Sequence, residues 1–242
     1  MDASFDTRLR RYAEVTVEVG LNLQAGQRLM VVAPVETAPF VRLVGELAYR
    51  AGARLVDVMW KDDALLKARF DHAPRDSFEE YANWRSEALL EAVRRGDAVL
   101  AVYASDPDLL AGQDPGLIAT VQRTEQHHGK PVTEELMRGR TNWSVVSYPI
   151  PSWAARVFPD APPAEQVDRL WETILAVCRM NEEDPVAAWR AHVTELERRA
   201  SWLEGHDFRE LRYRGPGTDL SVGLPRGHRW RFGQEESTSG SP

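Results

Sequence analysis

The sequence predicts an α/β protein with a doubly wound, mostly parallel sheet, followed by a helical connector and a hairpin. Three observations support this fold class. Four short apolar runs alternate with helical patterns over about 150 residues, which is typical of a parallel sheet covered by helices. Two longer helical patterns come next. A pair of strand-like runs joined by a glycine-rich turn then follows.

The first elements are read from periodicity and from their end signals. Apolar positions recur at helical spacing over residues 5–20, and Gly20 can end the predicted helix. The first strand is expected at 28–33 (RLMVVA), a nearly continuous apolar run typical of a strand buried on both faces. A second helix follows, with Thr37 as its predicted N-cap and Pro39 in its first turn.

The remaining elements of the sheet follow the same pattern. A second buried strand is expected at 55–60 (LVDVMW), and further strands are expected at 98–103 (AVLAVY) and 143–148 (WSVVSY). Helices are predicted over 77–96 and from Asp114-Pro115 to about His128. The start of the second helix is indicated because aspartate can cap the free N–H groups of a helix and proline is favoured at the first helical position. Together these elements predict a Rossmann-like N-terminal domain over residues 1–160.

Residues 161–206 are predicted to form the helical connector. One helix spans about 163–180, and the other begins at Asp184-Pro185 and ends at Gly205. The apolar positions of the second helix alternate spacings of three and four and so form one apolar face. Such a face packs on another helix or sheet, of this chain or of a partner. Strand-like runs at 208–214 and 219–224 then flank Gly215-Pro216-Gly217-Thr218, which indicates a hairpin.

Composition narrows the function classes. The 242 residues carry a net charge of −7, and their basic residues are scattered, so neither nucleic acid nor an anionic membrane is an expected partner. Cys178 is the single cysteine and cannot form an internal disulfide; a buried, inert thiol is expected. No targeting signal or membrane-spanning run is recognised, and a cytoplasmic location is expected.

Individual residues point to no catalytic or metal-binding pattern. The first strand-to-helix connection, residues 33–37, has no glycine and therefore lacks the dinucleotide fingerprint. The six histidines show no metal-ligand spacing, and His127-His128 is interpreted as a solvated helix end. One open alternative is a hydrolase site at the carboxyl ends of the strands. There the loops at Glu36-Thr37 and Ser105-Asp106 offer carboxylates and hydroxyls without a base.

A small basic and aromatic cluster, Arg226-Gly227-His228-Arg229-Trp230-Arg231, allows two interpretations. It could meet a substrate carboxylate or an acidic partner surface. The alternative is the rim of the hairpin, with Trp230 stacking on further parts of a domain.

Several short sequence words, taken in order, resemble the M29 family of metallo-aminopeptidases (the aminopeptidase T and aminopeptidase S type) over residues 5–233. They are Tyr12-Ala13-Glu14, 20–27 (GLNLQAGQ), 51–53 (AGA) before 56–58 (VDV), 142–146 (NWSVV), 151–154 (PSWA), 157–159 (VFP), 181–186 (NEEDPV) and 214–225 (RGPGTDLSVGLP). The motif at 214–225 is the most specific of them when it follows the others in order.

The resemblance implies a broad-specificity, homodimeric exopeptidase that releases N-terminal residues from peptides. It also implies two divalent metals, zinc or cobalt, in the full-length family enzyme. In that family an α/β domain precedes a catalytic domain whose Glu, His and Asp side chains hold the metals and activate a bound water.

The ligand residues themselves are not found in this sequence. The family's first metal-binding glutamate lies in a Pro-Thr-Glu-Glu-Val-Phe-Thr word, and Glu235-Glu236 lacks the residues that should flank it. We therefore assign no catalytic or metal residue and expect no metal bound to this chain; the substrate-binding residues are unknown. Residues 207–242 are expected to be the start of a truncated catalytic domain plus a polar tail. This chain alone is expected to be inactive. The alternative is a shortened, non-catalytic paralogue that acts as a binding or oligomerisation module.

Overall fold

The computed structural model describes residues 3–231 and residue 237. The chain divides into two compact units, residues 1–186 with 236–242 and residues 187–235. The predicted polar tail at 233–242 lies outside the described residues, with the exception of Ser237. The predicted borders at residues 160 and 206 stay predictions.

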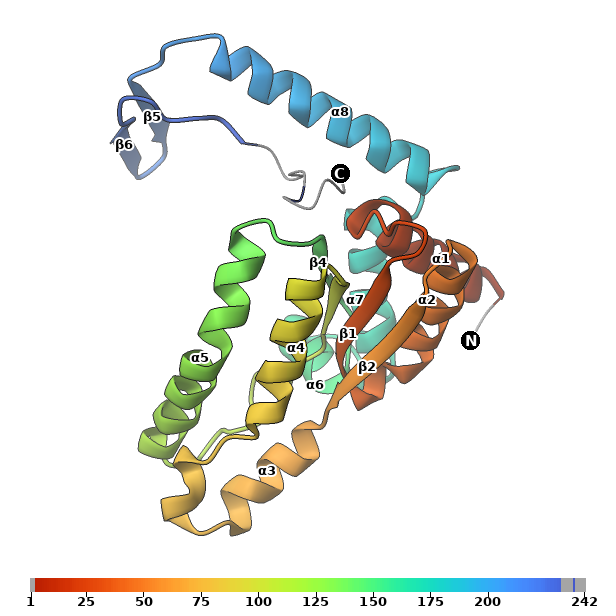
Figure 1. Cartoon of the computed structure of the whole chain (residues 1–242), viewed down its shortest axis with the longest axis vertical. Coiled ribbons are helices and arrows are strands. Elements are labelled where there is room, and N and C mark those ends of the chain that lie inside the picture. Colours follow the sequence, from red (N-terminus) through yellow and green to blue (C-terminus); the bar gives the residue numbers. More distant parts are fainter. Residues whose placement is uncertain (1–2, 232–236, 238–242) are drawn as a thin grey trace. The chain divides into compact units, whose positions relative to one another are not determined.

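The first unit is built on a four-stranded parallel sheet with the strand order β2-β1-β3-β4 (Figure 1). Its strands are β1 (Arg28–Pro34), β2 (Leu55–Lys61), β3 (Ala98–Tyr103) and β4 (Trp143–Ser147). All four predicted strands are confirmed, with ends that differ by at most one residue. The apolar run of β1 is buried as expected, with Leu29 and Val31 almost fully enclosed, and Leu100 of β3 is enclosed as well. The prediction of a buried strand at 55–60 is wrong, because β2 is an edge strand and leaves Leu55 and Trp60 exposed.

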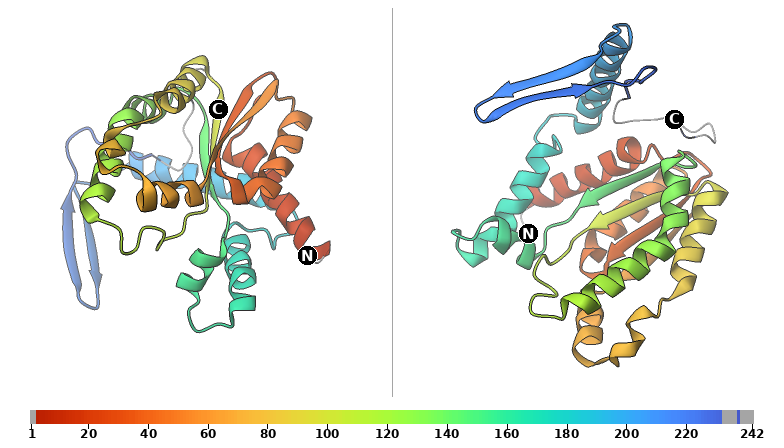
Figure 2. Two further views of the ribbon diagram at one scale, coloured as in Figure 1. Left: turned by 90° about the horizontal axis from the view of Figure 1, so that it is seen from below. Right: turned by 90° about the vertical axis from the view of Figure 1, so that its left-hand side faces the viewer.

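Helices cover both faces of the sheet (Figures 1 and 2). On one face lie α1 (Ala3–Val15), its π-helical continuation Thr16–Gly20, and α2 (Ala38–Arg50). On the other face lie α4 (Asn83–Arg95) and α5 (Pro115–Met137). Apolar side chains of α4, β3 and α5 form one buried cluster, Val93, Val99 and Val132. The doubly wound α/β fold is therefore confirmed.

The segment between β2 and β3 differs from the prediction. It begins with a helix that the sequence reading missed, α3 (Asp63–His72), whose N-terminus is capped because the Asp62 carboxylate accepts the N–H groups of Ala64 and Leu65. A short 3₁₀ segment, Arg75–Glu79, follows and buries Phe78. The predicted helix at 77–96 therefore begins only at Asn83.

Helix α5 also differs from its predicted end at about His128. It continues through Pro131 to Met137, because Val132 beyond the proline packs into the cluster with Val93 and Val99. His127-His128 is thus no helix end. The His128 ring stacks on Tyr81, with centroids 4.4 Å apart and an interplanar angle of 5°.

Two predicted helix starts have different outcomes. Asp114 caps α5, since its Oδ1 accepts the N–H of Gly116 at 2.8 Å. Thr37 occupies the N-cap position of α2 but does not cap it. Its buried hydroxyl instead donates to the Pro34 carbonyl at 2.7 Å, which tightens the glycine-free connection after β1.

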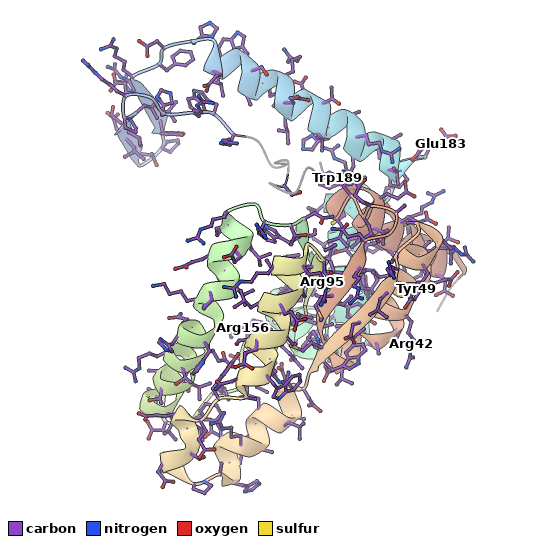
Figure 3. The ribbon with its side chains drawn as sticks, viewed as in Figure 1. Arg42, Tyr49, Arg95, Arg156, Glu183 and Trp189 are labelled. Atoms are coloured by element: carbon purple, nitrogen blue, oxygen red, sulfur yellow. The ribbon has the colours of Figure 1, made fainter. Side chains whose placement is uncertain are left out.

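A polar network ties the amino end of the sheet together. The Asn142 side-chain amide donates to the Leu21 carbonyl at 2.6 Å, and its Oδ1 accepts from Gln27 Nε2 at 2.6 Å. Gln27 Nε2 also donates to the Gly96 carbonyl at 2.8 Å. Nearby, Arg95 (labelled in Figure 3) pairs with the buried Asp97 carboxylate at 2.5 Å.

Side chains form hydrogen bonds with outward-facing backbone groups of both edge strands, β4 and β2. At β4, Tyr12 Oη accepts the Ser147 N–H and donates to the Ser147 carbonyl, each at 3.1 Å. At β2, the Val56 N–H donates to Tyr49 Oη at 3.1 Å, and the Trp60 carbonyl accepts from Arg85 Nη1 at 3.0 Å (Tyr49 is labelled in Figure 3).

Three helices follow β4 in the part of the chain that the structure describes. They are α6 (Pro151–Val157), which was not predicted, α7 (Pro163–Val177) and α8 (Pro185–Glu204). Trp171 of α7 is buried against Phe5 of α1, with ring centroids 5.4 Å apart. Cys178 follows α7 and is partly rather than fully buried; this burial raises the pKa of its thiol, which stays protonated at neutral pH.

The second unit consists of most of α8 and an antiparallel hairpin. The hairpin strands are β5 (Glu210–Gly215) and β6 (Thr218–Gly223), so the predicted hairpin is confirmed. Gly217 in its turn has φ +75°, a conformation that favours glycine. Trp230, in the basic and aromatic cluster, donates its backbone N–H to Glu204 Oε2 at 2.9 Å. Within the described residues, no helix combines the length and apolar character needed to cross a membrane.

Candidate functional site

A cleft of about 920 Å³ lies at the carboxyl edge of the parallel sheet, within the first unit. Glu36 lines it directly after β1, and Asp106 lines it in the loop after β3. In the strand order β2-β1-β3-β4, β2 is added on one side of β1, and the chain then returns to add β3 and β4 on the other side. In open α/β sheets such a reversal opens a crevice outside the carboxyl ends of the two strands, where ligands commonly bind. The topology therefore positions this cleft.

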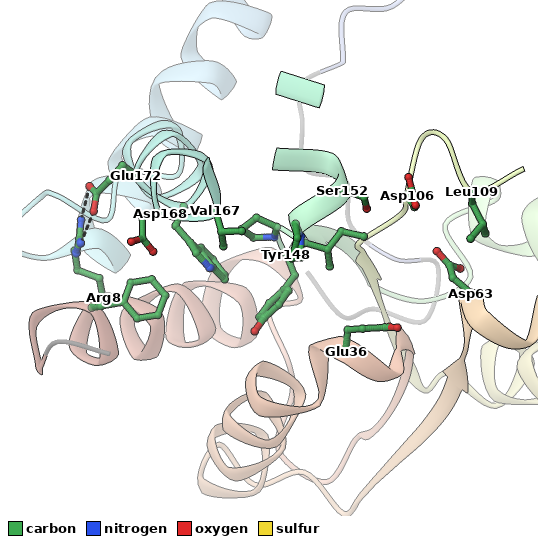
Figure 4. A pocket seen from close by; sticks show the side chains of 15 residues that line it. Arg8, Glu36, Asp63, Asp106, Leu109, Tyr148, Ser152, Val167, Asp168 and Glu172 are labelled. Atoms are coloured by element: carbon green, nitrogen blue, oxygen red, sulfur yellow. Dashed lines mark hydrogen bonds and ion pairs between the residues drawn. The ribbon is translucent and has the colours of Figure 1, made fainter. Parts of the chain in front are cut away.

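Charged side chains from separate elements line the cleft (Figure 4). Five are acidic and one is basic: Glu36, Asp63, Asp106, Asp168, Glu172 and Arg8. The Arg8 guanidinium binds both carboxylate oxygens of Glu172, at 2.7 and 2.6 Å, and this contact lowers the pKa of Glu172. The other four carboxylates form no ion pair with any residue in the described ranges. The cleft is therefore net negative.

Most of the remaining lining is apolar or aromatic. It consists of Phe5, Leu109, Tyr148, Pro149, Ile150, Pro151, Val167 and Trp171, together with the polar Ser152. Tyr148 meets the Trp171 ring edge to face, with centroids 5.0 Å apart, and burial raises the pKa of its phenol. Three of these residues follow β4 directly, and two lie on α7. Two packed segments therefore build a preformed wall.

Tyr12 of α1 holds this wall in place. Its hydroxyl pairs with the backbone of Ser147, the residue before Tyr148, and its ring stacks on Phe40 of α2 with centroids 5.3 Å apart. Burial raises the pKa of Tyr12 far above its usual value, so the hydroxyl is neutral. Its role is therefore to fix the end of β4.

The titratable side chains that line the cleft are carboxylates, Arg8 and Tyr148. The residues that line the cleft include no histidine, cysteine or lysine that could activate the Ser152 hydroxyl as a nucleophile. Throughout residues 3–231 and 237, no group of three or more His, Cys, Asp or Glu could hold a metal ion. These residues do not fit a metal centre.

No site residue was assigned from the sequence, and a site at the carboxyl ends of the strands was one open alternative, with the loops at Glu36-Thr37 and Ser105-Asp106. The structure brings Glu36 and Asp106 into one cleft. Asp63 was not named, because helix α3 was not recognised although Asp62-Asp63 directly follows β2. Asp168 and Trp171 were not named either, since only tertiary packing returns α7 to the sheet edge.

The fold and the site together define a class: a doubly wound α/β domain with an acidic, aromatic cleft at the switch point of its parallel sheet. The chain matches the family described as thermophilic metalloprotease (M29) over residues 5–242. It belongs to this family, as its sequence words indicated.

Named relatives agree with this assignment. The chain is 41% identical over 240 residues to aminopeptidase T of Thermus thermophilus, covering 99% of this chain and 59% of that protein. It is 40% identical over 236 residues to aminopeptidase 2 of Geobacillus stearothermophilus, covering 98% of this chain and 57% of the relative. A solved structure of wild-type AmpT from Thermus thermophilus superposes with a TM-score of 0.91 at 39% identity, over 98% of this chain and 58% of that one. The chain thus spans less than two thirds of the length of these relatives.

Proposed function

We propose that this chain forms the N-terminal part of a metal-dependent aminopeptidase, an enzyme that releases N-terminal amino acids from peptides with the help of divalent metal. The observation that carries this proposal is the family match over residues 5–242, together with relatives named aminopeptidases at 40 and 41% identity. The chain supplies the α/β unit, the connecting helices and the hairpin.

Residues outside this chain supply the metal ligands in this proposal. Its support is twofold: the relatives extend well beyond the matched region, and the described residues contain no ligand group for a metal. In the whole enzyme, two zinc or cobalt ions would activate the attacking water and polarise the scissile carbonyl. No residue of this chain is given a part in that step.

An activity assay with two proteins tests the proposal. The 242-residue chain alone, incubated with leucine p-nitroanilide and cobalt or zinc, is expected to give no turnover above the metal blank. A chimera in which this chain replaces the matched region of Thermus thermophilus aminopeptidase T is expected to show metal-dependent turnover.

Two results contradict the proposal in different ways. Strong metal-dependent turnover by the chain alone contradicts the placement of the ligands outside it. A soluble chimera that has native circular dichroism and binds metal, yet gives no turnover, contradicts the assignment to an aminopeptidase.

A second candidate function is a binding or oligomerisation module. It is favoured by apolar side chains that the hairpin leaves exposed, Tyr213, Leu220 and Val222 at 49, 50 and 40%. Exposed apolar residues on both hairpin strands favour burial against another surface. We propose self-association as a homodimer in the cytoplasm. Static light scattering tests it, and a strictly monomeric mass at high concentration contradicts it.

A further inference from the structure

One face of β4 keeps apolar side chains in solvent. In the register of β3 and β4, Val99 lies beside Trp143, and Val145 is two residues further along β4, so these three side chains share a face of the sheet. Val99 packs against Val93 of α4 and Val132 of α5, which identifies the face that these two helices cover. Trp143 and Val145 are nevertheless 42 and 56% exposed. The cover of the two helices therefore ends before β4.

Aromatic side chains extend this surface. Tyr103 lies four residues after Val99 on β3, hence on the same face, and is 50% exposed. Its ring meets that of Trp153 of α6 edge to face, with centroids 5.6 Å apart. We call the surface formed by Tyr103, Trp143, Val145 and Trp153 the β4 face. Because strands of parallel sheets are ordinarily covered by helices on both faces, an amphipathic helix laid on the β4 face would complete this layer.

The second unit of the same chain carries such a helix. Helix α8 is 20 residues long, and its apolar positions recur at spacings of three and four, which gathers them on one side of the helix. They are Val186, Trp189, Val193, Leu196, Ala200 and Leu203. All six are only partly buried. Covering this apolar side would therefore remove further apolar surface from water.

Net charge favours a contact between unlike units. Residues 1–186 contain 21 Lys and Arg against 29 Asp and Glu, so the first unit is acidic. Residues 187–231, the described part of the second unit, contain nine Arg against six Asp and Glu and are basic. Opposite charges attract, whereas two acidic first units repel each other on approach. The charges thus favour α8, and not a second β4 face, as the surface that covers the β4 face.

The path of the chain favours the α8 of a second molecule. Helix α7, which precedes α8, packs on α1, where Trp171 contacts Phe5 and Tyr12 with ring centroids 5.4 and 6.4 Å apart. Helix α1 lies on the face of the sheet opposite α4 and α5 (Figure 2). The chain therefore leaves the first unit from the side of the sheet that does not carry the β4 face.

We propose that α8 of one molecule docks on the β4 face of a second copy of this chain, with Val193 and Leu196 against Trp143 and Val145. By two-fold symmetry the α8 of the second molecule covers the β4 face of the first, so one dimer buries both surfaces twice. This inference rests on the self-association proposed above and names the two surfaces that meet.

Cross-linking between two differently tagged copies of the 242-residue chain tests the pairing. Cys178→Ser first removes the single native cysteine from both copies. One copy then carries Val145→Cys and the other Leu196→Cys, and a short bis-maleimide is expected to join the two tags in one product. The matched control moves the second cysteine to Ala191, an exposed position on the other side of α8, and is expected to give a far lower yield.

Charged variants measure what each surface contributes to the affinity. Val145→Lys and Val193→Asp are each expected to weaken dimerisation in sedimentation velocity by about tenfold or more, because each buries an unpaired charge in an apolar contact and has the sign of the opposing unit. Leu65→Lys on α3, where the side chain is 70% exposed, and Ala191→Asp on α8 are the controls. Both are expected to leave the dimerisation constant unchanged within about twofold.

Four results overturn the proposal. They are a strictly monomeric mass at high concentration, a mixed cross-link no stronger than the Ala191 control, a Val145→Cys copy that cross-links to a second Val145→Cys copy, and a monomeric product when both cysteines are placed in one molecule. Unchanged dimerisation of the Val193→Asp variant, with native circular dichroism, also overturns it, and this readout stands if Val145→Lys does not fold.

These outcomes separate the inference from the proposed function. A dimer that persists in both charged variants overturns the choice of surfaces and leaves the proposed self-association standing. The chimera assay for metal-dependent turnover does not depend on how the 242-residue chain associates. Its failure therefore contradicts the aminopeptidase assignment and leaves the contact between α8 and the β4 face untouched.

Discussion

Arg8 of α1 and Glu172 of α7 form a bidentate ion pair, with Nη1 2.7 Å from Oε2 and Nη2 2.6 Å from Oε1. The residues are 164 positions apart, so the pair ties the first helix of the chain to the helix that closes the cleft. The Glu172 side chain is 57% exposed, which limits what the pair contributes to stability.

Glu172→Gln is expected to lower the free energy of unfolding at pH 7 by about 0.5–1 kcal/mol, because solvent screens an exposed pair even with two hydrogen bonds. The pKa of Glu172 is lowered in the folded state, so the contribution is present above the unfolded pKa of about 4.5 and is lost as pH falls through the folded value. Urea unfolding of the wild type and variant at pH 7 and pH 3 measures this, and an equal difference at both pH values contradicts it.

Tyr12→Phe is expected to destabilise the fold by about 1–2 kcal/mol, since it removes a buried hydroxyl that satisfies both backbone groups of Ser147. Tyr49→Phe is the matched control. Its hydroxyl accepts one backbone N–H, but the side chain is 51% exposed and water can replace it. A loss below about 0.5 kcal/mol is expected there. Equal losses in urea unfolding contradict the role given to Tyr12.

Asn142→Ala is expected to cost about 2–3 kcal/mol, because the Leu21 carbonyl loses its side-chain donor and Gln27 Nε2 keeps only one of its two acceptors, the Gly96 carbonyl. Gln122→Ala, an exposed amide on α5, is the control and should change stability by less than about 0.5 kcal/mol. Chemical denaturation of the two variants decides this, and a loss at Asn142 no greater than that at Gln122 refutes the bridging role.

Two glycines with open space around them are expected to respond to alanine with opposite signs. Gly129 lies inside α5, so Gly129→Ala should stabilise the protein by about 0.5–1 kcal/mol through helix propensity. Gly96 follows α4 with φ +87°, so Gly96→Ala should destabilise it by about 1 kcal/mol. Thermal unfolding followed by circular dichroism provides the measurement. Shifts of the same sign contradict this account.

The central strands β1 and β3 were predictable because their apolar runs are continuous and the sheet buries both faces, as at Val31 and Leu100. The run of β2 also predicted a strand, but its exposure could not be predicted, since it follows from the place of β2 at the edge of the sheet. The helix errors arose where tertiary contacts override local signals. Pro131 marks an end by itself, yet Val132 packs against Val93 and keeps α5 helical. At Ser77, a helical pattern is interrupted because Phe78 turns into a buried cluster with Phe70.

The site was predictable only where it depends on strand ends. Glu36 and Asp106 follow from the topology rule, since any parallel sheet brings the ends of neighbouring strands together. Tyr148 and Trp171 could not be paired from sequence, because their contact depends on how α7 folds back beside α1. The ion pair between Arg8 and Glu172 has the same origin.

The side chains that form hydrogen bonds with the edge strands affect how copies of this chain can associate. A strand from a second molecule that paired with the outward groups of Ser147, Val56 or Trp60 would have to displace the side chain of Tyr12, Tyr49 or Arg85. Open sheet edges are the usual templates for intermolecular strand pairing and for aggregation. With these groups engaged, copies of the first unit are expected to meet through their side-chain surfaces and not by forming a continuous intermolecular sheet.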